Sequence, residues 1–224
     1  MRHGMVHWFE PGELDEDRRR TYEAIVRGPR AGSATAARFT DDQGRLEGPF
    51  NAMLANPVLG LAVQSVGAAL RYRTSLSERL RELAILTVAA EERSGFEWLV
   101  HERLAPAAGI SRDELAVVHD GGEPPTLSSD ERLAREVVLE MARTHHLGEG
   151  LVARAVEVLG EVGLVELVDL VGYYQLLAMS MHVLRTPLPE GAAPPFGWPR
   201  PAPPLSRRPP GTPRTAGGAR AGTR

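Results

Sequence analysis

The chain has 224 residues, 42% of them hydrophobic, which is enough to bury one sizeable core without a metal or disulfide staple. It contains no cysteine, and this excludes disulfides, thiolate metal sites and any thiol nucleophile or redox cycle run by this chain alone. The net charge is −3, and because residues 191–224 contain arginine but no acidic residue, the remainder is more acidic still and is expected to repel nucleic acid.

Helical periodicity runs from about residue 14 to 185, and no alternating pattern of useful length indicates a strand. The start of the chain leads into acidic and polar residues, so no signal peptide is expected. The sequence predicts an all-α bundle of about eight helices. The helical segments are expected at 14–27, 50–54, 57–72, 77–92, 95–108, 112–119, 129–146, 149–160 and 163–185, the second of them short.

Capping and turn residues mark the ends of these helices. Pro57 suits the first turn of a helix, where a missing N–H removes no hydrogen bond. Gly109 and Gly121 follow helices, where a positive φ is favourable. Three pairs have the spacing of a capping box: Ser75 with Glu78, Ser111 with Glu114, and Ser128 with Glu131.

The composition divides the chain into three parts. Residues 1–48 are predicted to form a helix and loop that belong to the same domain as the helical body at 49–186. From Thr186 onward 11 of the 18 prolines occur among Gly, Ala and Arg, so residues 187–224 are expected to be a disordered basic tail. The longest apolar stretch, 164–183, is interrupted by polar and charged residues, which favours a buried helix of a cytoplasmic protein with no membrane partner.

Glu97 and His101 stand four residues apart in one predicted helix, so their side chains share a face. A carboxylate one turn from an imidazole can fix its tautomer, and an imidazole exchanges protons near neutral pH. The spacing is consistent with an acid–base pair or with an ordinary pair of surface charges.

The stretch Leu80–Glu102, with Gly163–Met179 and Pro187–Gly191, resembles the carboxymuconolactone decarboxylase-like family over about residues 45–190. The resemblance implies an AhpD-like helical bundle and a homo-oligomer, a trimer or hexamer. Apolar residues on more than one stripe of the last helix independently favour self-association.

In the redox branch of that family, the AhpD-like alkylhydroperoxidases, a Glu is followed after 12, 15 and 19 residues by a Cys, a second Cys and a His. In this chain those offsets fall on Glu82, Ser94, Glu97 and His101. The Glu and the His of this pattern are kept, but both cysteines are replaced, so thiol peroxidase activity is not expected.

In the decarboxylase branch a Glu and a His stand four apart in place of the thiols, as Glu97 and His101 do here. The resemblance implies a reaction in which a carboxylated lactone loses CO₂ to a dienolate that is then protonated at carbon. His101 would donate that proton, Glu97 would orient it, and Arg81 or Arg93 would hold a substrate carboxylate. Each of these arginines is more often a solvated helix charge, by the usual surface location of Arg.

Further candidates surround this pair. Glu82 either faces the same pocket or faces solvent, and Ser94 is either a pocket hydroxyl or, as we favour, the N-cap of the helix that follows. Tyr173, Tyr174 and His182 lie on the apolar last helix, where their polar atoms need partners or pocket water.

The sequence therefore predicts an enzyme that acts by proton transfer on a small carboxylated or lactone-type substrate, without metal or other cofactor. The alternatives are a non-catalytic binding or assembly protein on the same scaffold and a redox partner that depends on the thiols of another chain.

Overall fold

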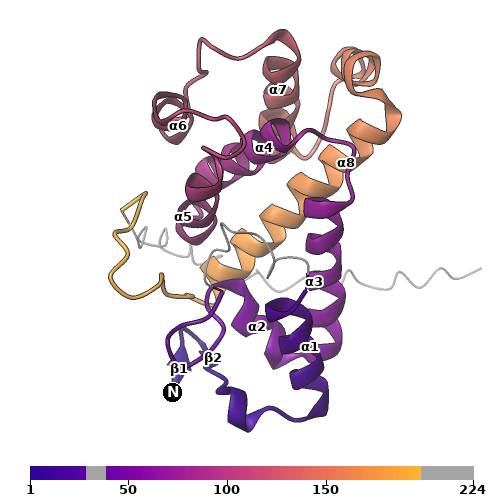
Figure 1. The fold of residues 1–224 in the computed structure, drawn as a ribbon. Helices are drawn as coiled ribbons and strands as arrows, with labels where there is room; N and C mark the ends of the chain where they lie inside the picture. Colours follow the sequence, from indigo (N-terminus) through magenta and orange to yellow (C-terminus); the bar gives the residue numbers. More distant parts are fainter. Residues whose placement is uncertain (29–38, 198–224) are drawn as a thin grey trace, which may run out of the picture.

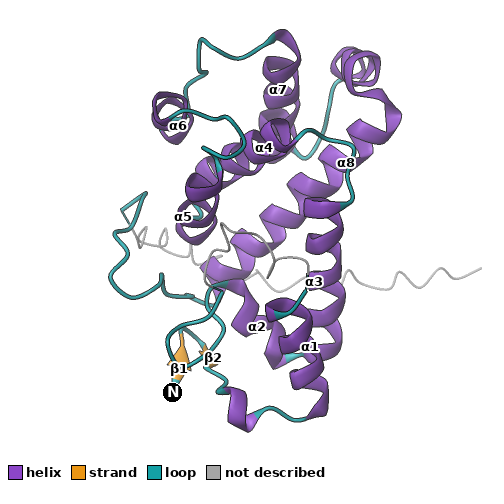
Figure 2. Cartoon of the chain, in the orientation of Figure 1, coloured by secondary structure: helices purple, strands orange, loops and turns teal. Residues whose placement is uncertain are grey.

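The computed structural model describes residues 1–28 and 39–197. The described residues form eight α-helices, which confirms the predicted all-α class (Figures 1 and 2). The helices are α1 (Glu16–Val26), α2 (Pro49–Ala55), α3 (Pro57–Tyr72), α4 (Glu78–Glu91), α5 (Gly95–Leu104), α6 (Arg112–His119), α7 (Ser129–Thr144) and α8 (Glu149–Val183). The predicted disorder of residues 198–224 lies outside the described residues. The first part of the predicted loop at 31–48, up to residue 38, lies outside them as well.

Local signals place most helix ends correctly. Ser111 and Ser128 form the two predicted capping boxes at α6 and α7. The expected box at Ser75 is wrong, because α4 is capped by Ser77, whose hydroxyl accepts from the Leu80 N–H at 3.2 Å. Ser75 instead donates its N–H and hydroxyl to the Glu166 carboxylate of α8, a partner distant in sequence.

The predicted division of the last helical region is also present. Helix α8 is broken at Gly160, whose φ of 72° and ψ of 168° are not helical. Glycine adopts this positive φ without a Cβ clash. The break redirects the chain so that its longer second part runs along the body of the molecule (Figure 1).

A short antiparallel hairpin of β1 (Arg2–His3) and β2 (Val6–His7) precedes a 3-10 turn at Pro11–Glu13. Strands of two residues are too short for an alternating pattern, and this explains why the sequence did not predict them. The Trp8 indole that follows donates to the Leu46 carbonyl at 2.8 Å, which ties the N-terminus to the chain before α2.

Helix α4 lies at the centre of the fold and packs against α5, α6, α7 and α8. Every residue from Leu80 to Ala89 is buried, including the charged Arg81 and Glu82. A helix that is covered on all sides reads as apolar throughout rather than amphipathic. Helices α5 and α8 both pack on this buried helix, and His101 of α5 meets Glu82 of α4.

Residues 187–197, which the composition assigned to the disordered tail, pack on the body of the protein. Leu188 packs against the main core, and Phe196 stacks on the His119 ring at 4.8 Å and lies edge-on to Trp98 at 5.6 Å. The Pro-rich composition was misleading here because single aromatic and aliphatic anchors are enough to hold a short segment in place.

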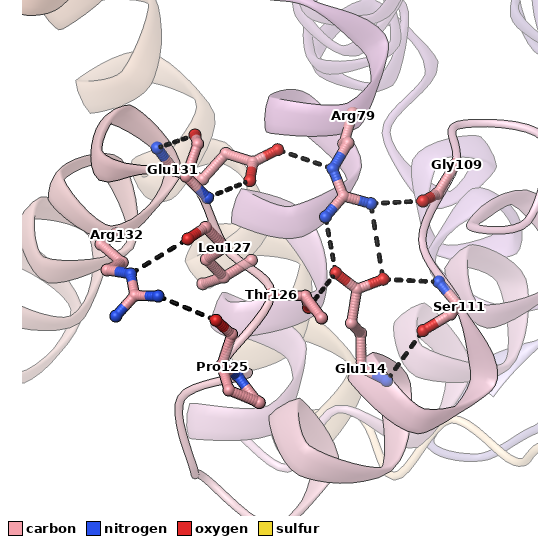
Figure 3. Close-up of polar contacts among 10 residues, drawn as sticks. Arg79, Gly109, Ser111, Glu114, Pro125, Thr126, Leu127, Glu131 and Arg132 are labelled. Atoms are coloured by element: carbon pink, nitrogen blue, oxygen red, sulfur yellow. Dashed lines mark hydrogen bonds and ion pairs between the residues drawn. The ribbon is translucent and has the colours of Figure 1, made fainter.

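Arg79, in the first turn of α4, joins this helix to α6 and α7 (Figure 3). The Arg79 guanidinium binds Glu114 of α6 and Glu131 of α7, each at 2.6 Å, and also donates to the Gly109 carbonyl. Glu114 further accepts from the Ser111 N–H and the Thr126 hydroxyl, at 2.7 Å each. These hydrogen bonds fix α6 and α7 on α4.

We expect this network to make the free energy of unfolding sensitive to acid. The Arg79 hydrogen bond, which outweighs burial, lowers the pKa of Glu114 from 4.5 to about 2. A depressed carboxyl pKa stabilises the fold above the unfolded value and loses that contribution as pH falls from about 4.5 towards 2. Urea unfolding over this range should show a smaller loss in Glu114→Gln than in wild type. Glu136→Gln, in an exposed pair with Arg154, is the control and should behave as wild type.

Apolar side chains remain exposed along one stripe of α8, with a further group on the adjacent α3. They are Val162, Val165, Val168, Leu176, Met179 and Val183 on α8, and Val58, Leu59 and Val66 on α3. Most of the α8 members recur at intervals of three and four residues, as in a helix that packs against another helix. No described helix is long and apolar enough to cross a membrane.

We predict that this stripe pairs with copies of the same chain. Light scattering at micromolar concentration should report an oligomer, with a trimer or hexamer expected. The double substitution Val165→Glu and Met179→Glu should shift it towards monomer, because burying two charges in an apolar interface is unfavourable. A wild-type monomer would contradict the prediction.

Candidate functional site

Four helices bring polar side chains together inside the fold. His101 of α5 places its Nδ1 2.6 Å from Oε2 of Glu82 of α4, and its Nε2 3.3 Å from the Tyr174 hydroxyl of α8. Arg71, at the end of α3, donates from Nη1 to the other Glu82 oxygen at 3.0 Å and lies 3.5 Å from Nδ1 of His101. The cluster is buried, with 3% of Glu82 and 4% of His101 exposed.

The charges of this cluster support one another. Burial raises the pKa of Glu82, but His101 and then Arg71 outweigh it and hold that pKa below its usual value. Glu82 is therefore ionised and requires a proton on Nδ1 of His101. Burial raises the pKa of Tyr174 despite the opposing charge of Arg71, so Tyr174 keeps its proton. Both ring nitrogens of His101 thus have protein partners.

The partner that the sequence predicted for His101 was wrong. Glu82 bonds to the imidazole, whereas neither carboxylate oxygen of Glu97 has a hydrogen-bond partner among the described residues. The alternative of a solvent-facing Glu82 is also excluded by its burial.

Glu97 is buried close to the cluster, and among the described residues neither of its carboxylate oxygens has a hydrogen-bond partner. Burial raises the pKa of Glu97 to about 8, and the neighbouring Ser94 hydroxyl offsets this only in part. The carboxyl group is therefore protonated at neutral pH. Glu97 precedes His101 by four residues on α5, which places it on the same side of this helix as the cluster.

Ser94 connects this carboxyl group to a cavity. The cavity measures about 380 Å³ including its open mouth, and Ser94, Arg93 and His182 line it together with Leu188 and Phe196. Ser94 occupies the favoured N-cap position of α5, but its side chain makes no capping hydrogen bond. The predicted pocket hydroxyl is the better description.

The other predicted residues separate into two groups. Arg93 and His182 line this cavity. Arg81 is buried on α4, 3.8 Å from Glu78, and none of the described cavities is lined by it. Tyr173 lies edge-on to Tyr174 at 5.3 Å, and the Tyr174 hydroxyl contacts His101.

Arg71 was not predicted from the sequence. It precedes Glu82 by 11 residues on a different helix, and no fixed spacing relates residues on two helices. The signal that could have found it is charge balance, since a buried Glu requires a cation or a proton. Within the described residues, no three acidic or imidazole side chains converge as metal ligands would.

The arrangement combines a protonated carboxylic acid near a cavity with a hydrogen-bonded chain from Arg71 to Tyr174. A neutral acid can donate a proton at neutral pH, and a fixed imidazole can stabilise charge that develops beside it. The chemistry that these residues support is therefore proton transfer.

Comparison with known proteins agrees with this architecture. The carboxymuconolactone decarboxylase family matches residues 57–140, whereas no curated protein matches the chain. The fold is similar to that of a protein of unknown function from Agrobacterium tumefaciens, named as a candidate antioxidant defence protein AhpD. The TM-score is 0.57 at 15% identity, over 64% of this chain and 99% of the other.

The fold is also similar to the debrominase Bmp8 in complex with 2,3,4-tribromopyrrole, with a TM-score of 0.64 at 10% identity, over 83% of this chain and 92% of that protein. At these identities the neighbours bear on the fold alone. The matched segment runs from the start of α3 into α7 and includes Arg71, Glu82, Glu97 and His101. Residues 57–140 of this cysteine-free chain thus match the carboxymuconolactone decarboxylase family, and its fold is similar to that of an AhpD-like protein.

Proposed function

We propose that the chain is an acid–base enzyme that acts on a small carboxylated or lactone-type molecule, with decarboxylation as the reaction for which its family is named. The observation that carries the proposal is the Glu97 carboxyl group, which is 3% exposed, has no hydrogen-bond partner among the described residues and follows by three residues Ser94, which lines a cavity. Burying an acid without a partner destabilises a fold, and such groups are concentrated at functional sites.

In the proposed reaction the bond between the substrate carboxylate and its carbon breaks and CO₂ leaves. The electron pair passes into a dienolate conjugated with the lactone carbonyl. Glu97 then donates its proton to carbon and recovers one from water, so the net change is the exchange of CO₂ for a proton. Arg93, which lines the cavity, is suited to hold the carboxylate before it leaves.

The structure favours Glu97 over His101 as the proton donor. Both nitrogens of the imidazole face protein groups, Glu82 and Tyr174, whereas the Glu97 carboxyl oxygens have no hydrogen-bond partner among the described residues. His101 is then a positioning residue. With Glu82 and Arg71 it forms a rigid, charged support beside Glu97, and it maintains the electrostatics of the site.

The experiment that tests this function uses 4-carboxymuconolactone and related lactones with a conjugated carboxylate, incubated with the protein in D₂O. We expect release of CO₂ and a product that carries one deuterium at carbon, as detected by mass spectrometry. The absence of both products across these substrates, with the protein folded and oligomeric, would contradict decarboxylation.

A second candidate is a binding or assembly protein on the same scaffold. It is favoured by the closure of the site, since Glu82, Glu97 and His101 are all at most 4% exposed. A scaffold would retain its partner binding and its oligomeric state after loss of Glu97, whereas an enzyme would lose turnover. The debrominase neighbour supports the enzyme, because it shows that this fold accommodates a small ring compound.

A further inference from the structure

A second cavity shares Arg93 with the first but leads away from the Glu97 site. It lies between α4, the end of α6 and α7, and measures about 570 Å³ including its mouth. Arg135 of α7 lines it together with Arg93, and Val118 and Leu139 provide apolar wall. No residue of the Arg71 to Tyr174 cluster takes part in it.

Arg135 is unusual because it is a buried cation without a counter-ion. Only 5% of the residue is exposed, and no ion pair among the described residues includes it. Its Nη2 donates to the carbonyls of Gly121 and Gly122, at 3.3 and 2.5 Å, which anchors the end of α6. Its Nε donates to no described residue. A buried guanidinium without a carboxylate is destabilising, so the position indicates an anion that is recruited from outside the chain.

The acidic groups around the cavity are already engaged. The Glu91 carboxylate accepts hydrogen bonds from Nε and Nη2 of Arg143, at 3.0 and 2.8 Å. Oδ1 of Asp120 lies 2.9 Å from Nδ1 of His119. Glu123 acts on Arg135 only from beyond ion-pair distance, and burial lowers the pKa of Arg135 more than these carboxylates raise it. Arg93 also lacks an ion pair within the described residues, and its Nη2 donates to the Phe196 carbonyl. Glu91 and Asp120 line the cavity as well, so what it offers an incoming anion is two guanidinium groups, Arg93 and Arg135, that have no ion pair within the described residues.

We propose that this cavity binds a small organic anion, whose carboxylate or phosphate group pairs with Arg135 and Arg93 and whose apolar part lies against Val118 and Leu139. The planar fork of arginine suits both oxyanions. This site goes beyond the proposed function, because it does not use Glu97 or His101 and remains whether or not the chain is an enzyme.

Isothermal titration with three probes tests the proposal on the full-length protein. Benzoate supplies a carboxylate on an apolar ring, benzamide is its neutral counterpart, and inorganic phosphate supplies the alternative oxyanion. We expect benzoate or phosphate to bind, and benzamide to bind at least about tenfold more weakly than benzoate, since a charged hydrogen bond contributes at least this factor. Binding of benzoate alone would identify a carboxylate ligand, and binding of phosphate alone would identify a phosphate ligand.

Arg135→Gln should weaken binding of the anion at least about tenfold, because it removes the guanidinium group. Arg154→Gln, an exposed arginine on α8, is the matched control and should bind as wild type. If Arg135→Gln fails to fold, the exposed Arg93→Gln replaces it and should weaken binding in the same direction. Equal binding of benzoate and benzamide, unchanged affinity in the arginine variants, or no binding of either anion would overturn the proposal.

Discussion

Replacing Glu97 by Gln is expected to lower turnover by about 10²–10⁴-fold without unfolding the protein, since this is the usual contribution of a general acid. The amide has the same shape but cannot deliver a proton. His101→Gln should cause a smaller loss, because the imidazole positions the site and its nitrogens are bonded to Glu82 and Tyr174. The rate of CO₂ release from the active lactone measures both variants.

The order of the two losses assigns the acid. A larger loss in His101→Gln would identify His101 as the donor, in agreement with the original expectation from the sequence. Circular dichroism and light scattering should show both variants folded in the wild-type oligomer. Glu136→Gln, which alters a surface glutamate on α7, should keep full activity and serves as the control. Full activity in both site variants would contradict the proposed site.

The same Glu97→Gln substitution is expected to stabilise the protein at neutral pH. Burial raises the pKa of Glu97 from 4.5 to about 8. A raised carboxyl pKa stabilises the fold fully below the unfolded value, and that contribution is lost as pH rises from about 4.5 through about 8. At pH 7 a neutral amide should therefore increase the free energy of unfolding by about 3–4 kcal/mol, because pH 7 lies about 2.5 units above the unfolded pKa and each unit contributes about 1.4 kcal/mol.

Urea unfolding at several pH values checks this expectation. Wild type should lose stability between about pH 5 and about pH 8, and Glu97→Gln should show a flatter dependence over that interval. Greater stability with lower activity is the usual signature of a residue retained for function. A variant that is less stable than wild type at neutral pH would show that Glu97 is a structural residue with partners.

The fold was largely predictable from the sequence because local signals set the helix ends. Pro57, the caps at Ser111 and Ser128, and the glycine at the α8 break act through their own neighbours. The errors arose where a distant residue decides the outcome. Ser75 satisfies its N–H and hydroxyl with Glu166, a residue of another helix, and no local pattern reveals that contact.

The candidate site was predictable only in part, for the same reason. The family frame located Glu82, Ser94, Glu97 and His101, and the structure brings Glu82 and His101 into contact. Helical spacing suggested the wrong partner for His101, since a shared face does not fix the direction of two flexible side chains. Arg71 and Tyr174 come from helices packed on either side, so only the tertiary structure shows that they complete the cluster.

The most direct test of Glu97 as the acid of the site is the titration of its carboxyl group. In protein labelled with ¹³C at the glutamate side-chain carboxyl, the resonance that disappears in Glu97→Gln identifies this residue. We expect this resonance to titrate with a midpoint near pH 8, so that the carboxyl group is protonated at neutral pH. A midpoint between about 4 and 5, as in an exposed glutamate, would leave no acid at the site and would contradict the central claim.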